Sequence, residues 1–264
     1  PTLGEAMHLT SNQYDHPNRW IGEWQQLNAF IEMEPHKSEN FQRLAWHYFM
    51  VGLWDRALEV AEQHYELNPL SVRTIENLAS VLQLRGDFDR AIELSNVAAE
   101  LGSTRPRFAE EEKKRRACPE GDLDCLIDTL SAEFAPMIEP FRIIYRIPAT
   151  EGQAAESLQT AYELFEQVPQ TLNWFNGAAC YAEHLTPLFF YTWEYALENN
   201  VAGRWFFPNG WGESCTAVHS APEFIDYINV TELDEYWREV EWPHFCQPQG
   251  DSFTCGRNIS VAAD

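Results

Sequence analysis

Landmark residues of this sequence recur every 34 positions between Ser38 and Thr104. The recurring positions are Leu44 and Leu78, Tyr48 and Leu82, Gly52 and Gly86, and the triplets Asp55-Arg56-Ala57 and Asp89-Arg90-Ala91. A period of this length is typical of stacked helix-turn-helix units, because one pair of helices cannot bury its apolar face without a neighbouring pair. A β-strand, whose side chains alternate with a period of two, could not use this spacing. The segment is therefore predicted to be helical.

Glycine and proline mark the ends of the helices in each repeated unit. Gly52 and Gly86 fall where the first helix of each unit must stop, a position that favours a residue free to take a positive φ. Pro69 closes the first unit, and Pro35 occupies the same place one period earlier. We therefore expect a partial unit upstream, whose second helix spans Trp20 to Met33.

The segment from Ser38 to Thr104 resembles the tetratricopeptide repeat in both spacing and residue type. The small-residue positions of that family are matched by Ala45, Gly52, Ala57 and Ala61 in the first unit, and by Ala79, Gly86, Ala91 and Ala98 in the second. His64 departs from the pattern, because the family usually has alanine there. The resemblance implies an all-α fold, a solenoid of antiparallel helical hairpins.

The same resemblance implies a binding surface, since the first helices of such units line a concave face. In the family's register the candidate binding residues are Gln42, Trp46, Phe49, Met50, Arg73, Glu76, Ser80 and Gln83. An exposed stripe of Trp46, Phe49 and Met50 would be an apolar patch of the kind that marks a peptide or helix site. Alternatively, the N-terminal helix or the C-terminal segment covers this face, and Trp46 is then fully buried.

A second resemblance lies in the segment from Ala221 to Cys255. Its Tyr236-Trp237, Trp242-Pro243 and flanking residues are similar to the C-terminal tail of bacterial repeat regions found in membrane-anchored winged-helix transcriptional activators and class III adenylate cyclases. This resemblance implies a module for sensing or protein interaction outside the cytoplasmic membrane. Neither an output domain nor the preceding transmembrane helix of such regulators is found in these 264 residues.

The charge balance restricts the kind of partner. With 18 basic and 41 acidic side chains, the chain carries a net charge of −23, which makes contact with nucleic acid or an anionic membrane unfavourable. No apolar run approaches the ~20 residues that span a bilayer. Pro1 is not an initiator and no signal-peptide pattern follows it, so we expect a processed chain or an excised soluble region. The expected partner is a protein or peptide, or a second copy of the chain.

Six cysteines indicate an oxidising compartment. The second resemblance implies that this compartment is the periplasm or the extracellular space of a bacterium. Turn-rich spacers predict one disulfide between Cys118 and Cys125 and another between Cys246 and Cys255. Cys180 and Cys215 remain by elimination, although spacing alone does not fix their pairing. A zinc site is the competing interpretation, but neither close pair has a two-residue knuckle, so we expect no metal and no cofactor.

The remaining chain divides by its local patterns. We assign 1–37 to an arm and the partial repeat, 38–104 to two repeats, 105–200 to divergent helical repeats, and 201–264 to a loop and an irregular, disulfide-stapled C-terminal cap. Helices are expected over 106–116, 124–134, 150–169, 170–184 and from Thr186, and the stretch 136–148 fits either a strand or a helix. Ser220 and Thr231 are predicted to cap two short helices near the end.

Motifs of catalysis are missing from the sequence. It has no His-Glu-x-x-His, no phosphate-cradling glycine loop and no serine nucleophile elbow, so we expect no enzyme activity. Two functions remain open: the sensory or protein-interaction part of a membrane-anchored regulator, or a free-standing secreted or periplasmic scaffold that self-assembles or binds glycans. Glycan stacking would use Trp205, Phe206, Phe207 and Trp211, although packing of this loop onto the helices is the competing interpretation.

Overall fold

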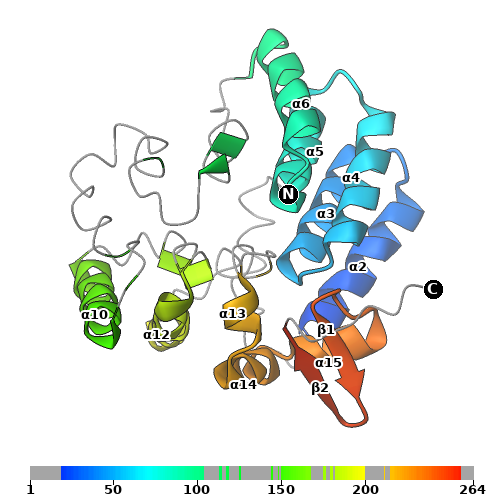
Figure 1. Cartoon of the computed structure of the whole chain (residues 1–264). Coiled ribbons are helices and arrows are strands. Elements are labelled where there is room, and N and C mark those ends of the chain that lie inside the picture. The colour runs from blue at the N-terminus through cyan, green and yellow to red at the C-terminus, as the bar shows by residue number, and fades with distance from the viewer. Residues whose placement is uncertain are drawn as a thin grey trace.

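The chain is mostly helical in the computed structural model (Figure 1). The structure describes residues 19–103, 113–114, 117–118, 125, 144, 148, 150–167, 175–176, 179–180, 182–199, 211 and 215–256. No described helix combines the length and the hydropathy that a bilayer span requires.

Five helices follow one another in the N-terminal part, each in contact with the next and joined to it by a short turn (Figure 1). They are α2 (Arg19–Met33), α3 (Ser38–Met50), α4 (Trp54–Leu67), α5 (Val72–Arg85) and α6 (Phe88–Glu100). The helices predicted from the repeat period are therefore confirmed. Gly52 and Gly86 have φ angles of 81° and 86°, as expected for the two turns.

Small residues allow these helices to approach closely. Ala45, Ala57, Ala61 and Ala91 are all fully buried, and each occupies a position that the repeat pattern reserves for a small side chain. Larger side chains there would overpack the contact between neighbouring helices. The sequence period therefore reflects packing between helices.

A second group of helices follows the part of the chain that lies largely outside the described residues. It consists of α10 (Glu151–Gln167), the short 3₁₀ helix η3 (Glu183–Leu185), α12 (Thr186–Glu198), α13 (Thr216–His219), α14 (Pro222–Val230) and α15 (Leu233–Glu239). The helix expected from residue 150 and the one opening at Thr186 are both present. The predictions for 106–116, 124–134, 136–148 and 170–184 fall mainly outside the described residues.

The caps predicted for the last two helices are wrong. Ala221 and Glu232 occupy the N-cap positions of α14 and α15. The Ser220 hydroxyl instead donates to the Thr216 carbonyl, and that of Thr231 donates to the Tyr227 carbonyl, because both residues end the preceding helix. Each hydroxyl finds its partner one turn back, an arrangement that competes with capping.

The C-terminal cap contains a regular β-hairpin, which the all-helical prediction missed. Strands β1 (Cys246–Gln249) and β2 (Ser252–Cys255) are antiparallel, and Cys246 faces Cys255 in the register. These two cysteines form a disulfide, as predicted. The other two bonds join Cys118 to Cys125 and Cys180 to Cys215, so all three expected pairs are present.

The C-terminal segment folds back onto the turn between α3 and α4. Two buried indoles make this contact: Trp211 Nε1 donates to the Met50 carbonyl at 3.0 Å, and Trp237 Nε1 donates to the Val51 carbonyl at 2.8 Å. Phe245 stacks on Trp211 with ring centroids 5.6 Å apart. The aromatic residues of the tail therefore cover the turn between the two helices of the first repeated unit.

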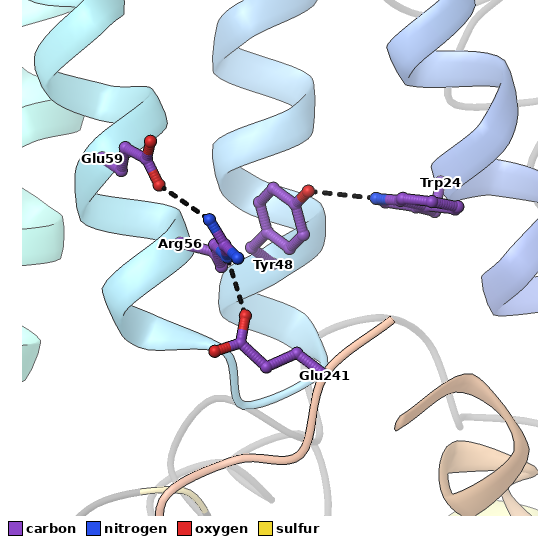
Figure 2. Close-up of polar contacts among 5 residues, drawn as sticks. All are labelled: Trp24, Tyr48, Arg56, Glu59 and Glu241. Atoms are coloured by element: carbon purple, nitrogen blue, oxygen red, sulfur yellow. Dashed lines mark hydrogen bonds and ion pairs between the residues drawn. The ribbon is translucent and has the colours of Figure 1, made fainter. Parts of the chain in front are cut away.

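Polar contacts surround this junction (Figure 2). The Arg56 guanidinium on α4 reaches Glu241 of the tail at 2.7 Å and Glu59 of its own helix at 3.2 Å. On the neighbouring helices, Trp24 Nε1 donates to the Tyr48 hydroxyl at 3.0 Å. Because Arg56 and Glu241 are about half exposed, this ion pair contributes little to stability, roughly 0.2 to 1 kcal/mol.

We predict that Gly52→Ala destabilises the fold more than Gly102→Ala. A Cβ at Gly52 would lie 3.2 Å from Phe245 Cζ and 3.3 Å from Trp211 Cδ2, whereas a Cβ at Gly102 meets no atom of the described residues within 4 Å. Both glycines have positive φ, so both variants carry the same kind of backbone strain. The excess loss at Gly52, about 1 to 3 kcal/mol from overpacking, is measured by urea unfolding. Equal losses would contradict the contact with the tail.

We also predict that Trp237→Phe lowers the free energy of unfolding by about 1 to 3 kcal/mol, because the buried Val51 carbonyl loses its donor. Trp242→Phe is the matched control, since it removes the same group from a half-buried ring of the same segment. Thermal unfolding should separate the two variants clearly. A stability for Trp237→Phe that matches the control would show that the hydrogen bond does not hold the tail in place.

Candidate functional site

The predicted binding residues lie on α3 and α5, the first helices of the two repeated units. These two helices contact each other directly. Gln42 and Trp46 are four residues apart on α3, and Glu76, Ser80 and Gln83 are separated by four and three residues on α5. Such spacings place side chains on one face of a helix, so each helix can contribute a coherent row to one surface.

The predicted apolar stripe is mostly core. Phe49 and Met50 are 3% and 2% exposed, so they cannot contact a partner without unfolding. The Phe49 ring packs against Trp46 and Trp54 within the same repeated unit. The accessible part of the predicted surface is therefore smaller and more polar than the sequence indicated.

Trp46 is half-buried. Its ring packs on Phe49 with centroids 5.2 Å apart, and Phe49 in turn stacks on Trp54 at 6.1 Å. These ring contacts hold the Trp46 indole on the side that faces Phe49. The chain therefore does not bury Trp46 completely, in contrast to the alternative stated above.

Polar side chains continue the surface along α5. Arg73 and Ser80 are at the more accessible positions of the row, while Glu76 and Gln83 are half-buried. The Ser103 hydroxyl donates to the Glu76 carboxylate at 2.5 Å, and the Ser80 hydroxyl donates to the Glu76 carbonyl at 2.8 Å. Ser103, which is not one of the predicted surface residues, thereby orients the Glu76 side chain. Ser103 lies one repeat period after Pro69, the residue that closes the first unit.

His64 of α4 lies buried beneath this surface and holds three helices together. Its Nε2 is hydrogen-bonded to the Ser38 hydroxyl of α3 and lies 3.4 Å from the Thr74 hydroxyl of α5. Burial, and to a lesser extent the positive charge of Arg73, lower the pKa of His64 below its usual value. The neutral imidazole thus takes the place of the usual alanine and links the two units through hydrogen bonds.

The serine and histidine of this contact resemble the start of a nucleophile–base arrangement. However, the imidazole is only 1% exposed, and among the described residues its Nδ1 has no hydrogen-bond partner that would orient it. A substrate could not reach this pair without separating α3 from α4. We therefore interpret Ser38 and His64 as packing residues.

No metal site is formed in the part of the chain that the structure describes. It contains no group of three or more histidine, cysteine or acidic side chains suitable for a metal ion. All six cysteines are in disulfides, so no thiolate is available as a ligand.

The aromatic loop considered for glycan stacking is only partly described. Trp211 is 1% exposed and belongs to the core around the α3–α4 turn, so it cannot serve as a stacking platform. Trp205, Phe206 and Phe207 lie outside the described residues.

Comparisons of the chain with protein-family models, with curated proteins and with solved structures find no match.

We predict that His64→Gln reduces the loss of stability on acidification. The folded state keeps His64 neutral, whereas the unfolded chain binds a proton there near pH ~6.5, so His64 contributes stability that is present above this pH and lost as the pH falls below it. One such group contributes a slope of at most about 1.4 kcal/mol per pH unit.

Urea unfolding of wild type and His64→Gln between about pH 7 and about pH 5 measures the difference. The exposed His36 of the α2–α3 turn provides the matched control, His36→Gln. A steeper decline in wild type and in His36→Gln than in His64→Gln is the expected result. Parallel curves for all three proteins would contradict it.

Proposed function

We propose that this chain is a non-catalytic helical repeat module that binds a protein or peptide partner on the surface formed by α3 and α5. The observation that carries the proposal is the pairing of a core-supported, partly accessible Trp46 with a row of polar side chains on the adjoining helix. Aromatic residues held from one side by packing are typical energetic centres of protein interfaces. The surrounding polar residues would form the rim of such a site.

We also propose that these helices form a solenoid of antiparallel hairpins, like that of tetratricopeptide repeats. It is supported by the regular recurrence of the landmark residues, by the positive φ of Gly52 and Gly86, and by the contacts of each helix with the next. Solenoids of this kind present their first helices side by side, and α3 and α5 are in contact here.

The chemistry of the surface favours a partner segment with both an apolar and an acidic group. Trp46 offers an aromatic face, and Arg73, which is not buried, offers a guanidinium that can bind a carboxylate in two places at once. Gln42, Ser80 and Gln83 add hydrogen-bonding groups that suit a peptide backbone. Glu76, already held by Ser103, would repel a second carboxylate and so restrict its position.

We further propose that the module works outside the cytoplasmic membrane, as the sensory part of a membrane-anchored regulator. The three disulfides support an oxidising compartment. The second candidate is a free-standing scaffold that self-assembles. The coding sequence upstream of Pro1 discriminates the two: a transmembrane helix behind a winged-helix or cyclase domain supports the regulator, and a cleavable signal peptide supports the scaffold.

Binding can be tested with peptides selected from a random library of about 12 residues displayed on phage. We expect Trp46→Ala to weaken the selected peptides by at least about tenfold, because the apolar centre of the site is lost. Tyr65→Ala is the matched control, since it truncates a half-buried aromatic residue on α4, a second helix. Fluorescence anisotropy measures both. Equal binding by wild type and Trp46→Ala, or the absence of any selected peptide, would refute the proposal.

A further inference from the structure

Large apolar side chains are exposed at three positions that are equivalent in the repeat. Met33, Leu67 and Leu101 follow one another at the repeat period, and they are 67%, 43% and 43% exposed. Met33 and Leu67 are the last residues of α2 and α4, and Leu101 directly follows α6. Single exposed apolar residues are normal, but a periodic set at the same structural position is a defined surface feature.

A glutamate precedes each of these apolar residues. Glu32, Glu66 and Glu100 are all exposed and share the same period. We call this set of three glutamates and three apolar residues the Glu–apolar edge. Leu70, which is 79% exposed in the turn after α4, adds to its apolar surface.

The edge lies at the end of the helical row away from the C-terminal segment. The turns after α2 and α4 and the end of α6 are on the far side of the row from the β-hairpin (Figure 1). The tail attaches to the carbonyls of Met50 and Val51, at the opposite end of α3 from the turn that follows Met33. The described part of the tail therefore does not reach the edge.

We infer that the Glu–apolar edge binds an extended segment of a partner protein in which apolar residues alternate with lysine or arginine. Each glutamate would pair with a basic side chain, and each neighbouring Met33, Leu67 or Leu101 would cover an apolar one. The net charge of −23 favours a basic partner and attracts it at long range. The inference does not rest on the proposed α3–α5 site, because a different surface and different residues carry it.

A second copy of the chain fits the edge poorly. Its own edge carries the same three glutamates, so pairing two edges would bring like charges together. The basic residue Lys113 of this chain is also engaged elsewhere, because it pairs with Asp89 at the start of α6. That position is the opposite end of α6 from Leu101.

The geometry restricts the partner to a repeating pattern. Helices in contact lie about 8 to 10 Å apart, so successive members of the edge, two helices apart, are separated by roughly 10 to 20 Å. An extended chain advances about 3.3 Å per residue. An apolar residue at every third to sixth position of the partner, with basic residues between, therefore matches the edge.

The test uses the full chain and peptides selected on it from a random phage library of about 12 residues. The first variant combines Met33→Ser, Leu67→Ser and Leu101→Ser, and the second combines Glu32→Gln, Glu66→Gln and Glu100→Gln. We expect one class of selected peptides to be basic and apolar, to lose at least about tenfold in affinity for each triple variant, and to bind Trp46→Ala as well as wild type. Because all six side chains are exposed, both variants should fold normally, which circular dichroism verifies.

A matched control separates a specific edge from general attraction to an acidic protein. Glu223→Gln, Glu235→Gln and Glu239→Gln together remove the same charge from exposed positions on α14 and α15. This control should retain wild-type affinity. Equal weakening by the control, selected peptides without basic residues, or peptides that ignore both edge variants would overturn the inference. A dimer in sedimentation that dissociates in the Met33, Leu67 and Leu101 variant would overturn it too, by naming a second copy as the occupant.

Discussion

Two indole N–H groups join the C-terminal segment to the turn between α3 and α4. Trp211 and Trp237 donate to consecutive carbonyls, those of Met50 and Val51, where α3 ends and the chain turns toward α4. A helix leaves its last carbonyls without partners inside the helix, and burying them unpaired would cost about 1 to 3 kcal/mol each. The two tryptophans satisfy these acceptors and at the same time bury large apolar rings. Gly52 completes the junction, since only a residue without a Cβ allows Phe245 and Trp211 to approach so closely.

The binding surface differs from the one expected because part of it belongs to the core. In an open array, Phe49 and Met50 would project from the first helix of the unit toward a ligand. Here the Phe49 ring packs against Trp46 and Trp54, and both Phe49 and Met50 are buried. Trp46, one turn earlier, is only half-buried. The site proposed for α3 and α5 is thus the accessible part of the larger predicted face.

The sequence predicted the helices of the repeated units well, because their period records local packing. Gly52, Gly86 and the buried alanines each leave a mark that recurs in the neighbouring unit. The β-hairpin left no such mark, since Cys246–Gln249 contains a proline and only its first residue is buried. The attachment of the tail was unpredictable for a different reason. It joins residues more than 160 positions apart, and no periodicity relates Trp211 or Trp237 to Met50 and Val51. His64 could be recognised in the sequence as a departure from the repeat pattern. Its partners Ser38 and Thr74 could not be predicted and are seen only in the structure.

The contacts between the C-terminal segment and the first helices affect how the chain folds and unfolds. Repeat proteins are nearly one-dimensional, so their units contact only neighbours, fold from any point and fray from the ends. Here Trp20 Nε1 donates to the Thr231 carbonyl across 211 positions of sequence, which joins the first described helix to the last ones. Contacts of such long range raise the contact order, and loop closure must precede them, so folding is slowed compared with an open array. We therefore expect α2 and α3 to unfold together with the C-terminal segment and not independently of it.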